Sequence, residues 1–406
     1  MSVSPALSHP RSRGRVGVGA ETQVGIIGAG PAGLMLSHLL HLQGIESVVL
    51  ETRSRDYVEA RVRAGVLEQG SADLLSSAGV GDRMRREGLV HDGIKLRFEG
   101  EEHRIDFRAL TGRGITVYGQ QEVVKDLIQR RLDDGGQIWF DTQATSIDGI
   151  EDHPSVSYCR DGKALRLSCD FIAGCDGSHG ISNGGGESRT YERSYPFAWL
   201  GVLAKTPPAT DELIYAYHDR GFALHSMRTP EISRLYLQVD ADETMANWPE
   251  DRIWSELRLR LAEPHLQPGE IIEDGITPMR SLVIEPMQRG QLFLAGDAAH
   301  IVPATGAKGM NLALNDVRIL AQGLSAWYRS GSRDQLDRYS EQCLRRVWRA
   351  EHFSAWMTGL LHRDQGGDPF EHKVRLSYLR YVTTSTAAAT TLAENYVGYD
   401  QLDRRR

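Results

Sequence analysis

A glycine-rich turn between two short apolar segments restricts the fold of this chain more than any other feature. Residues 23–28 are typical of a buried strand, residues 31–43 of a helix, and residues 47–51 of a second apolar strand. Pro31 fits the first turn of a helix, because the N–H that proline lacks has no partner there. Two strands joined by a helix form a βαβ unit, whose strands lie parallel in one sheet. The sequence therefore predicts an α/β fold with a Rossmann-like domain.

The turn itself, residues 28–33 (GAGPAG), has the spacing of a dinucleotide-binding fingerprint. We expect Gly28 to permit the tight turn, Gly30 to let the backbone approach a pyrophosphate, and Gly33 to allow close helix–strand packing. The positive end of the helix dipole would face the phosphates, and Glu51 would accept hydrogen bonds from a ribose. This motif alone does not distinguish NAD from FAD.

Two later segments also place an acidic residue at the end of an apolar strand. Asp176 follows one such strand, and Asp297 follows the predicted strand at residues 291–295. An aspartate in this position can bind a second ribose or a ribitol. A long helix is expected after Gly309, and its N-terminus can face an electron-rich ring.

The remainder of the chain predicts a β-rich segment and a helical end. Alternating runs in residues 94–118 indicate an antiparallel excursion, and a helix is expected at 120–132. Separate strands are expected at 165–168 and 171–174, and residues 197–240 predict successive strands. The expected division is a disordered leader (1–20), a discontinuous nucleotide-binding domain (21–95, 115–180 and 285–330), a β-rich substrate domain (96–114 and 181–284) and a helical C-terminal region (331–406).

Composition and charge narrow the classes of partner. The 406 residues carry a formal charge of −7, which argues against a nucleic-acid partner because phosphate binding requires a basic surface. No apolar run reaches the roughly 18 residues that span a bilayer, so no membrane partner is expected, and the leader lacks the apolar core of a secretion signal. The four cysteines have no metal-ligand spacing, so we expect no metal site and a cytoplasmic protein with reduced thiols.

The order and spacing of GAGPAG, Glu51, residues 175–177 (CDG) and residues 296–300 (GDAAH) resemble the FAD-binding single-component flavoprotein monooxygenases. The resemblance extends over residues 22–397 and includes specific segments at 63–70 (RAGVLEQG), 195–197 (YPF), 296–303 and 393–397 (AENYV). It implies FAD as cofactor, NADPH or NADH as co-substrate, and a homodimer. It also implies that the chain hydroxylates a small aromatic acid with O2, namely 4-hydroxybenzoate at the 3-position, through a flavin C4a-hydroperoxide.

One face of the β-rich domain carries residue types that can hold a buried carboxylate. Ser226 and Arg228 have period two along one predicted strand, and Arg234 and Tyr236 share a face of the next. A guanidinium between hydroxyl groups can bind a carboxylate through charged hydrogen bonds. A surface strand with a solvated arginine would show the same pattern. The resemblance assigns Ser226, Arg228 and Tyr236 to the benzoate carboxylate, and Arg234 to the flavin.

The resemblance assigns the handling of a phenolic proton to Tyr215 and Tyr396, with a relay to solvent through His91. Tyr215 also contacts the substrate in this assignment. Removing the phenolic proton makes the ring electron-rich toward an electrophilic oxygen. Without the resemblance, each tyrosine would be interpreted as a core aromatic residue. The resemblance places four apolar residues around the substrate ring, namely Val66, Ile181, Trp199 and Leu213.

Further assignments from the resemblance concern the two nucleotides. Beside the flavin it places Arg61, Arg63, Gln120, Gly309, Met310 and Asn311. At the reductant site it places His179 and Arg280, and a 2′-phosphate would meet Arg53, Arg55 and Tyr57. NADPH-specific members have a basic residue directly after the acid, whereas Thr52 follows Glu51 here, so both reductants stay open.

Ala304 departs from the pattern, because it stands where the family has a second proline. Its backbone carbonyl would face the 4-substituent of the substrate, so we count Ala304 with Asn311 among the catalytic and substrate residues. A less rigid loop makes a related acid such as 4-aminobenzoate conceivable. The short stretch Asn183–Ser188 also departs from the family, and it lies close to His179 in the sequence. A non-oxygenating flavoprotein oxidase or reductase and a benzoate-binding sensor are the alternative hypotheses.

Overall fold

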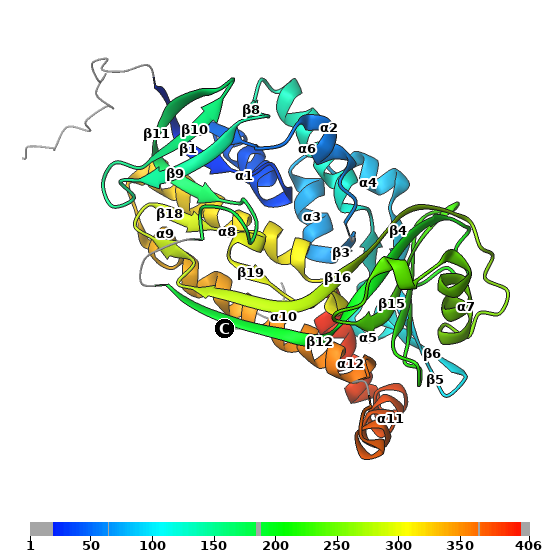
Figure 1. Cartoon of the computed structure of the whole chain (residues 1–406). Coiled ribbons are helices and arrows are strands. Elements are labelled where there is room, and N and C mark those ends of the chain that lie inside the picture. The colour runs from blue at the N-terminus through cyan, green and yellow to red at the C-terminus, as the bar shows by residue number, and fades with distance from the viewer. Residues whose placement is uncertain (1–18, 64, 184–187, 364–365, 399–406) are drawn as a thin grey trace, which may run out of the picture.

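The structure is a computed structural model that describes residues 19–63, 65–183, 188–363 and 366–398. Most of the predicted leader, the centre of the Asn183–Ser188 stretch and residues 399–406 lie outside these ranges. Within them the α/β fold is confirmed: two eight-stranded sheets lie side by side, a three-stranded sheet joins them, and helices pack on both (Figure 1).

The first sheet contains the predicted βαβ unit. Strand β1 is followed by helix α1 and then by β2, which pairs with β1 in parallel. The strand order is β17-β18-β11-β1-β2-β8, and β18, β11, β1, β2 and β8 all run parallel. The elements are β1 (Ala20–Ile27), α1 (Pro31–His41), β2 (Ser47–Leu50), β8 (Gln137–Trp139), β9 (Gln143–Asp148), β10 (Ser155–Arg160), β11 (Lys163–Gly174), β17 (Gln288–Arg289) and β18 (Leu292–Leu294).

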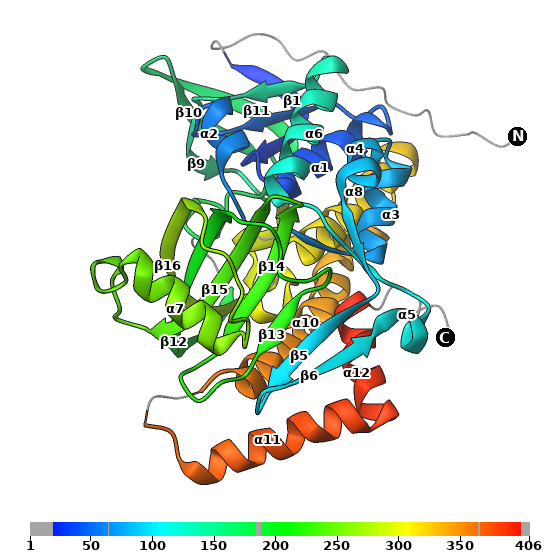
Figure 2. The same cartoon turned by 90° about the vertical axis from the view of Figure 1, so that its right-hand side faces the viewer.

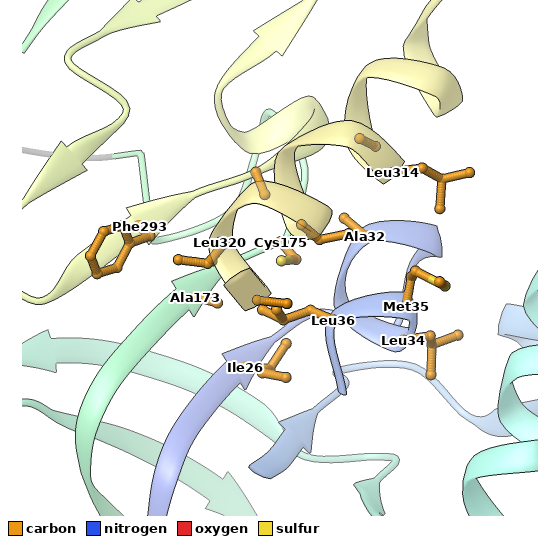
Figure 3. Packing of buried hydrophobic residues seen from close by; sticks show 14 of the residues in the cluster. Ile26, Ala32, Leu34, Met35, Leu36, Ala173, Cys175, Phe293, Leu314 and Leu320 are labelled. Carbon is orange, nitrogen blue, oxygen red and sulfur yellow. The ribbon is translucent and has the colours of Figure 1, made fainter. Parts of the chain in front are cut away.

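Helix α8 (Gly309–Ser330) crosses α1 above this sheet, and α6 (Gln120–Asp133) packs on the other side of α1. Leu34 and Leu36 of α1 are fully buried, as is Leu314 of α8, and all three belong to one buried cluster with side chains of β1, β11 and β18; Figure 3 shows Leu36 beside Ile26 of β1. Each such side chain contributes roughly 1.5–3 kcal/mol by leaving water. The core therefore fixes the ends of α1 and α8 relative to the strand ends.

The second sheet has the order β19-β16-β12-β15-β14-β13-β5-β6 and is antiparallel except where β13 meets β5. Helix α7 covers one face, and the other face is directed toward α10 and α12 (Figure 2). The elements are β5 (Gly93–Phe98), β6 (Glu101–Asp106), β12 (Arg189–Lys205), β13 (Ile214–Ala216), β14 (Ala223–Thr229), β15 (Ile232–Asp240), η1 (Met245–Asn247), α7 (Glu250–Arg260), β16 (Glu270–Glu285) and β19 (His300–Ile301).

The predicted helical C-terminal region begins after α8 and lies beside both sheets. Helix α10 packs along α8, and α12 packs against the short helix α5. The remaining elements are α2 (Arg55–Ala60), β3 (Val66–Glu68), α3 (Gln69–Ser77), α4 (Asp82–Glu87), β4 (Leu89–His91), α5 (Phe107–Thr111), β7 (Ile115–Val117), η2 (Gly296–Ala298), η3 (Ala304–Gly306), α9 (Asp334–Asp337), α10 (Tyr339–Leu361), α11 (Pro369–Thr384) and α12 (Thr386–Val397).

Local predictions fail where pairing partners decide the structure. Two strands are expected at 165–168 and 171–174, but β11 is one continuous strand because it pairs with both β10 and β1. β5 starts at Gly93 and pairs with β13, so strand pairing of the β-rich unit begins before residue 96. Helix α5 interrupts the antiparallel excursion at 94–118. None of the helices in the described ranges is long and apolar enough to cross a bilayer.

Candidate functional site

The glycine-rich turn has the geometry that its spacing predicts. Gly28 has a φ of 102°, and a β-carbon there would lie 2.4 Å from the carbonyl oxygen of Cys175. A β-carbon at Gly33 would lie 2.0 Å from the carbonyl oxygen of Gly28. At Gly30, by contrast, a β-carbon would meet no protein atom within 4 Å. Two glycines thus allow the backbone to pack closely, and the third leaves open space in front of α1.

The N-termini of α1 and α8 are both free to receive an electron-rich group. Neither helix has an acidic residue in its first turn or a side chain that caps its N-terminus. Gly309 starts α8, and a β-carbon there would again meet no protein atom within 4 Å. Neither helix dipole is therefore compensated by a carboxylate in its first turn, which suits phosphate oxygens at α1 and an electron-rich ring edge at α8. Met310 and Asn311 follow directly in this first turn.

Three predicted acidic residues surround the turn in different ways. Glu51 accepts hydrogen bonds from the backbone N–H groups of Ala29 and Arg53, both at 2.8 Å. Asp297 is exposed in η2, between buried neighbours. The carboxylate of Asp176 accepts hydrogen bonds from the backbone N–H and the hydroxyl of Ser182 at 3.1 and 3.0 Å.

Backbone contacts bring the three sequence motifs together. The N–H of Cys175 donates to the carbonyl oxygen of Ile27 at 2.8 Å, which places Asp176 directly beside Gly28. A β-carbon on Gly296, next to Asp297, would lie 3.5 Å from the β-carbon of Ala32 in α1. These residues fit an extended dinucleotide, with open space at Gly30, a free carboxylate at Asp297 and a second helix N-terminus at Gly309. Asp176 departs in part, because its carboxylate also closes its own loop.

A surface loop with two cations approaches this region. The N–H of Tyr118 donates to the carbonyl oxygen of Gly65 at 2.8 Å, which docks the end of the loop beside Gln120 at the start of α6. Arg61 and Arg63 are exposed, and among the described residues neither forms a hydrogen bond or an ion pair. Desolvation and the charge of Arg61 lower the pKa of Arg63, whereas the charge of Asp297 raises it. The loop that carries Arg61 and Arg63 therefore lies within electrostatic reach of Asp297 in η2.

The predicted carboxylate site is assembled by strand register. In the β14–β15 pair, Ser226 lies opposite Arg234 and Leu224 lies opposite Tyr236, so these side chains share one face. The guanidinium of Arg228 donates to the hydroxyl of Ser226 at 3.0 Å and to the carbonyl oxygen of Met227 at 2.9 Å.

Arg228 is a partly buried cation with no acidic partner in the described part of the chain. Its Nε–H is buried and donates to no acceptor there. Burial lowers the pKa of Arg228, Tyr236 raises it, and the nearby Arg234 lowers it further. A guanidinium in this situation gains much from an external carboxylate, because an unpaired buried charge is unfavourable.

Arg234 lies beside this group and is held differently. It forms a 3.4 Å ion pair with Glu273 and stacks over the ring of Tyr236, 5.2 Å from its centroid. A β-carbon on Gly201 would lie 3.0 Å from the Tyr236 ring and 3.1 Å from the Arg234 guanidinium. The missing side chain at Gly201 therefore makes room for both residues on this face.

Tyr215 and Tyr396 form the predicted hydroxyl pair. Their oxygens lie 2.5 Å apart, and the hydroxyl of Tyr215 also lies 3.3 Å from the carbonyl oxygen of Thr305. Both rings are fully buried, and Phe107 of α5 stacks on Tyr396 with ring centroids 5.0 Å apart. Burial raises the pKa of each tyrosine, so both remain protonated at neutral pH.

His91 is not in direct contact with these hydroxyl groups. It lies buried at the end of β4, and neither ring nitrogen forms a hydrogen bond with a described residue. Burial lowers its pKa, partly offset by Glu212, Asp211 and Asp92. The structure thus brings Tyr215 and Tyr396 together but leaves the expected connection to His91 without a protein hydrogen bond.

Three of the four predicted wall residues belong to one buried cluster. Val66, Trp199 and Leu213 pack with Tyr215 and Tyr396 in the core on this side of the second sheet. Ile181 instead lies exposed in the loop after β11, outside that cluster. Ile181 is therefore not packed with the other three, because its loop is held at the end of the first sheet by Asp176 and Ser182, and its assignment to the wall stays a prediction.

Ala304 and Asn311 flank the start of α8. Ala304 is exposed at the beginning of η3, and its N–H lies 3.4 Å from the sulfur of Met279. The side-chain amide of Asn311 accepts from the N–H of Glu68 at 2.9 Å and donates to the carbonyl oxygens of Val66 at 2.9 Å and Ala307 at 3.0 Å. Because both N–H donors of its amide are occupied by protein carbonyl groups, the Asn311 side chain has no donor left for a ligand.

A buried ion-pair cluster beside Tyr396 has no counterpart among the predicted site residues. The ammonium of Lys308 lies 2.6 Å from the carboxylate of Glu68 and 2.8 Å from the carbonyl oxygen of Tyr396. Arg346 of α10 pairs with the same carboxylate at 2.5 Å. The signal in the sequence was local, since Glu68 lies in the segment at 63–70 that carries the resemblance and Lys308 directly precedes Gly309 at the start of the predicted helix.

The residues expected at the reductant form two separate groups. The hydroxyl of Ser178 accepts from the guanidinium of Arg280 at 2.8 Å and lies 3.2 Å from the ring of His179, so these two predicted residues meet at one serine. At the other group, Arg53 stacks over Tyr57 at 5.1 Å. Arg55 is less available, because it pairs with Glu59 at 2.6 Å.

Comparisons with known proteins agree with this geometry. The family model "FAD binding domain" matches residues 21–354. The p-hydroxybenzoate hydroxylase of Acinetobacter baylyi is 50% identical over 386 residues, which are 93% of this chain and 95% of that protein. A 3-(3-hydroxy-phenyl)propionate/3-hydroxycinnamic acid hydroxylase of a Mycobacterium species is 25% identical and covers 75% of this chain and 54% of its own length.

The crystal structure of p-nitrophenol 4-monooxygenase from Pseudomonas putida superimposes with a TM-score of 0.81 at 19% identity, covering 95% of this chain and all of the other, and supports the fold. Fold and site together define a flavoprotein aromatic monooxygenase that uses FAD, with NAD(P)H as co-substrate. Within that class, the chain belongs to the p-hydroxybenzoate hydroxylase family.

Proposed function

We propose that this monooxygenase converts 4-hydroxybenzoate to 3,4-dihydroxybenzoate. One observation carries the proposal: Arg228, a cation without an acidic partner among the described residues, contacts Ser226 on the sheet face where Leu224 lies between Tyr236 and Tyr215, and Tyr215 forms the hydroxyl pair with Tyr396. An aromatic acid with a hydroxyl group opposite its carboxylate satisfies both ends of such a site. The name of the 50% identical relative points to the same substrate.

Each residue of the site then has a defined task. Arg228 binds the carboxylate through charged hydrogen bonds, with Ser226 and Tyr236 as additional donors. Tyr215 accepts the phenolic proton while its own proton passes to Tyr396 across the 2.5 Å contact. His91 receives the proton at the solvent end, and this step requires an intervening water because no direct hydrogen bond links them. Val66, Trp199 and Leu213 exclude bulk water from the ring.

The bound cofactor, reduced by NAD(P)H, supplies the activation of O2. The chain holds it with the turn at residues 28–33, with Glu51 and Asp297 at its sugars and with the N-terminus of α8 at its ring. The other proposed contacts come from Arg61, Arg63, Gln120, Asp176, Arg234, Gly309, Met310 and the backbone of Asn311. For the reductant we propose His179 and Arg280, and secondarily Arg53, Arg55 and Tyr57. The carbonyl of Ala304 would face the 4-substituent.

We further propose a cytoplasmic homodimer. The four cysteines are all free thiols, as expected in a reducing compartment. Helix α11 exposes an apolar face along one side, which a second copy of the chain would cover. The face comprises Phe370, Val374, Tyr378 and Tyr381. The predicted division into domains is kept as a proposal, with the boundary moved from residue 96 to Gly93.

The test is product identification with the purified, FAD-loaded protein. Consumption of NADH and of NADPH is followed with 4-hydroxy-, 4-amino-, 3-hydroxy- and 3,4-dihydroxybenzoate, and the products are identified by mass spectrometry. The proposal expects 3,4-dihydroxybenzoate in near-stoichiometric amount to the reductant consumed with 4-hydroxybenzoate. If 4-aminobenzoate is the only acid that yields a hydroxylated product, Ala304 would instead determine which substrate the enzyme accepts. Reductant consumption that yields only hydrogen peroxide with every acid would contradict the proposal.

A further inference from the structure

A buried histidine at the end of α10 holds the indole of Trp199. The indole N–H of Trp199 lies 2.6 Å from Nε2 of His362, and Nδ1 of His362 lies 3.0 Å from the carbonyl oxygen of Thr358. An indole N–H can only donate and a carbonyl oxygen can only accept. These two partners therefore fix one neutral tautomer of His362, with the proton on Nδ1 and the lone pair of Nε2 toward Trp199.

The same imidazole is enclosed by aromatic rings from the second sheet. It stacks on Phe197 with centroids 4.5 Å apart and 10° between the planes, and it lies 4.4 Å from the ring of Phe222. Trp199 in turn packs against Tyr236, with centroids 4.8 Å apart. His362 thus supports Trp199, and Trp199 supports the tyrosine proposed for the carboxylate end of the substrate.

A second branch leads from His362 to the hydroxyl end of the site. The hydroxyl of Thr358, whose carbonyl accepts from His362, lies 2.9 Å from the hydroxyl of Thr305. The carbonyl oxygen of Thr305 lies 3.3 Å from the hydroxyl of Tyr215. One turn of α10 therefore contacts a wall of the site through His362 and the η3 loop through Thr358.

We propose that His362 is a positioning residue that sets the fit of the aromatic acid by orienting Trp199 through the Nε2 acceptor. The inference rests on the proposed function for its substrate, but it concerns a side chain that touches neither substrate nor cofactor. A ring of equal shape without the acceptor would leave the indole N–H buried and unpaired. Trp199 would then rotate or recruit another acceptor, and Tyr236 would lose its packing partner.

The test compares three replacements that separate shape from hydrogen bonding. His362→Gln can place an amide oxygen where Nε2 lies, His362→Asn reaches only the position of Nδ1, and His362→Phe keeps the ring without either nitrogen. We expect KM for 4-hydroxybenzoate to rise about tenfold in the Asn and Phe variants, the scale of one unpaired buried donor. Coupling of reductant to product should fall in both, and His362→Gln should recover most of the loss.

His372→Phe is the matched control, since His372 stacks on Tyr217 and contacts its hydroxyl at 2.7 Å, with no contact to Trp199. FAD affinity, measured by quenching of flavin fluorescence, should be unchanged in all four variants. Equal KM and coupling in wild type and His362→Asn would overturn the inference, as would a loss in His362→Gln as large as that in His362→Asn. Absence of any hydroxylated product from the wild type would instead count against the proposed function. If His362→Phe does not fold, the comparison of His362→Gln with His362→Asn still tests the inference.

Discussion

The turn at residues 28–33 and the sheet face around Arg228 are constructed in opposite ways. The turn works by leaving side chains out: β-carbons at Gly28 and Gly33 would collide with backbone, and one at Gly30 would enter the space proposed for the cofactor. The sheet face works by placing polar side chains, from two adjacent strands and a distant helix, on one surface. Substitutions that add atoms should therefore disrupt the turn, and substitutions that remove atoms should disrupt the sheet face.

Adding one methyl group to the turn is expected to give the largest effect. Gly28→Ala forces a φ near 102° on a residue with a side chain and brings its β-carbon 2.4 Å from the carbonyl oxygen of Cys175. Strain and overpacking together predict a loss of about 2–6 kcal/mol in the free energy of unfolding. Urea denaturation monitored by circular dichroism measures this loss.

Gly30→Ala makes the comparison within the turn sharper. Its β-carbon meets no protein atom, so the unfolding free energy without cofactor should change by less than about 1 kcal/mol. FAD affinity should nevertheless fall, and fluorescence titration reports it. If Gly30→Ala binds FAD as tightly as the wild type, the open space in front of α1 does not hold the pyrophosphate.

This contrast explains which features were predictable. The turn and its helix are contiguous in sequence, and backbone sterics fix their form, so Gly28 and Gly33 have the close packing that their spacing predicts. The period-two pattern also placed the side chains of β14 and β15 on the correct face. Pairing between strands distant in sequence was not accessible, as the continuous β11 shows.

The parts of the site that were missed come from tertiary contacts. His362 and Trp199 are far apart in the chain, and no local pattern indicates that an imidazole will accept from that indole. The hydrogen bonds of the Asn311 amide and the internal bonds of Asp176 likewise depend on neighbours that the sequence alone does not identify. Ile181 was assigned to a wall by resemblance alone, and it is not packed with the other three wall residues.

On the substrate side, removing the cation should give the largest loss. Arg228→Ala takes away the guanidinium that has no acidic partner among the described residues, so benzoate binding should weaken by about 2–5 kcal/mol. Equilibrium titration of the flavin absorbance with 4-hydroxybenzoate measures the change. Arg220→Ala is the control, because Arg220 pairs with Glu256 near α7. Equal substrate affinity in wild type and Arg228→Ala would refute the carboxylate assignment.

Removing a single hydroxyl should have a smaller effect on binding and a specific effect on chemistry. Tyr215→Phe deletes the group that contacts Tyr396 and Thr305, so hydroxylation per reductant consumed should fall about tenfold or more. Tyr217→Phe, two residues further along the chain, removes a hydroxyl that contacts His372 of α11 instead of Tyr396 and should keep its coupling. Product yield per NAD(P)H, measured side by side, decides whether Tyr215 handles the proton.

The last prediction again compares different parts of the molecule, through the pH dependence of stability. Burial lowers the pKa of His362 to about 3, so the unfolded chain binds one more proton than the folded chain between pH 3 and the ordinary value of 6.5. This contribution to stability is complete above pH 6.5 and is lost as the pH falls, by up to about 1.4 kcal/mol per pH unit.

The contribution of His300, which lies near Asp297 in the chain, depends on pH in the opposite direction. Burial lowers the pKa of His300, but the carboxylate of Asp316, 2.6 Å away, raises this pKa overall. Its contribution is complete below pH 6.5 and is lost as the pH rises. Urea unfolding from pH 4.5 to 8 should therefore show that His362→Gln flattens the acid side of the stability profile and His300→Gln the alkaline side. If both variants changed the slope of the stability profile on the same side, the pKa values of the two histidines would not be shifted in opposite directions.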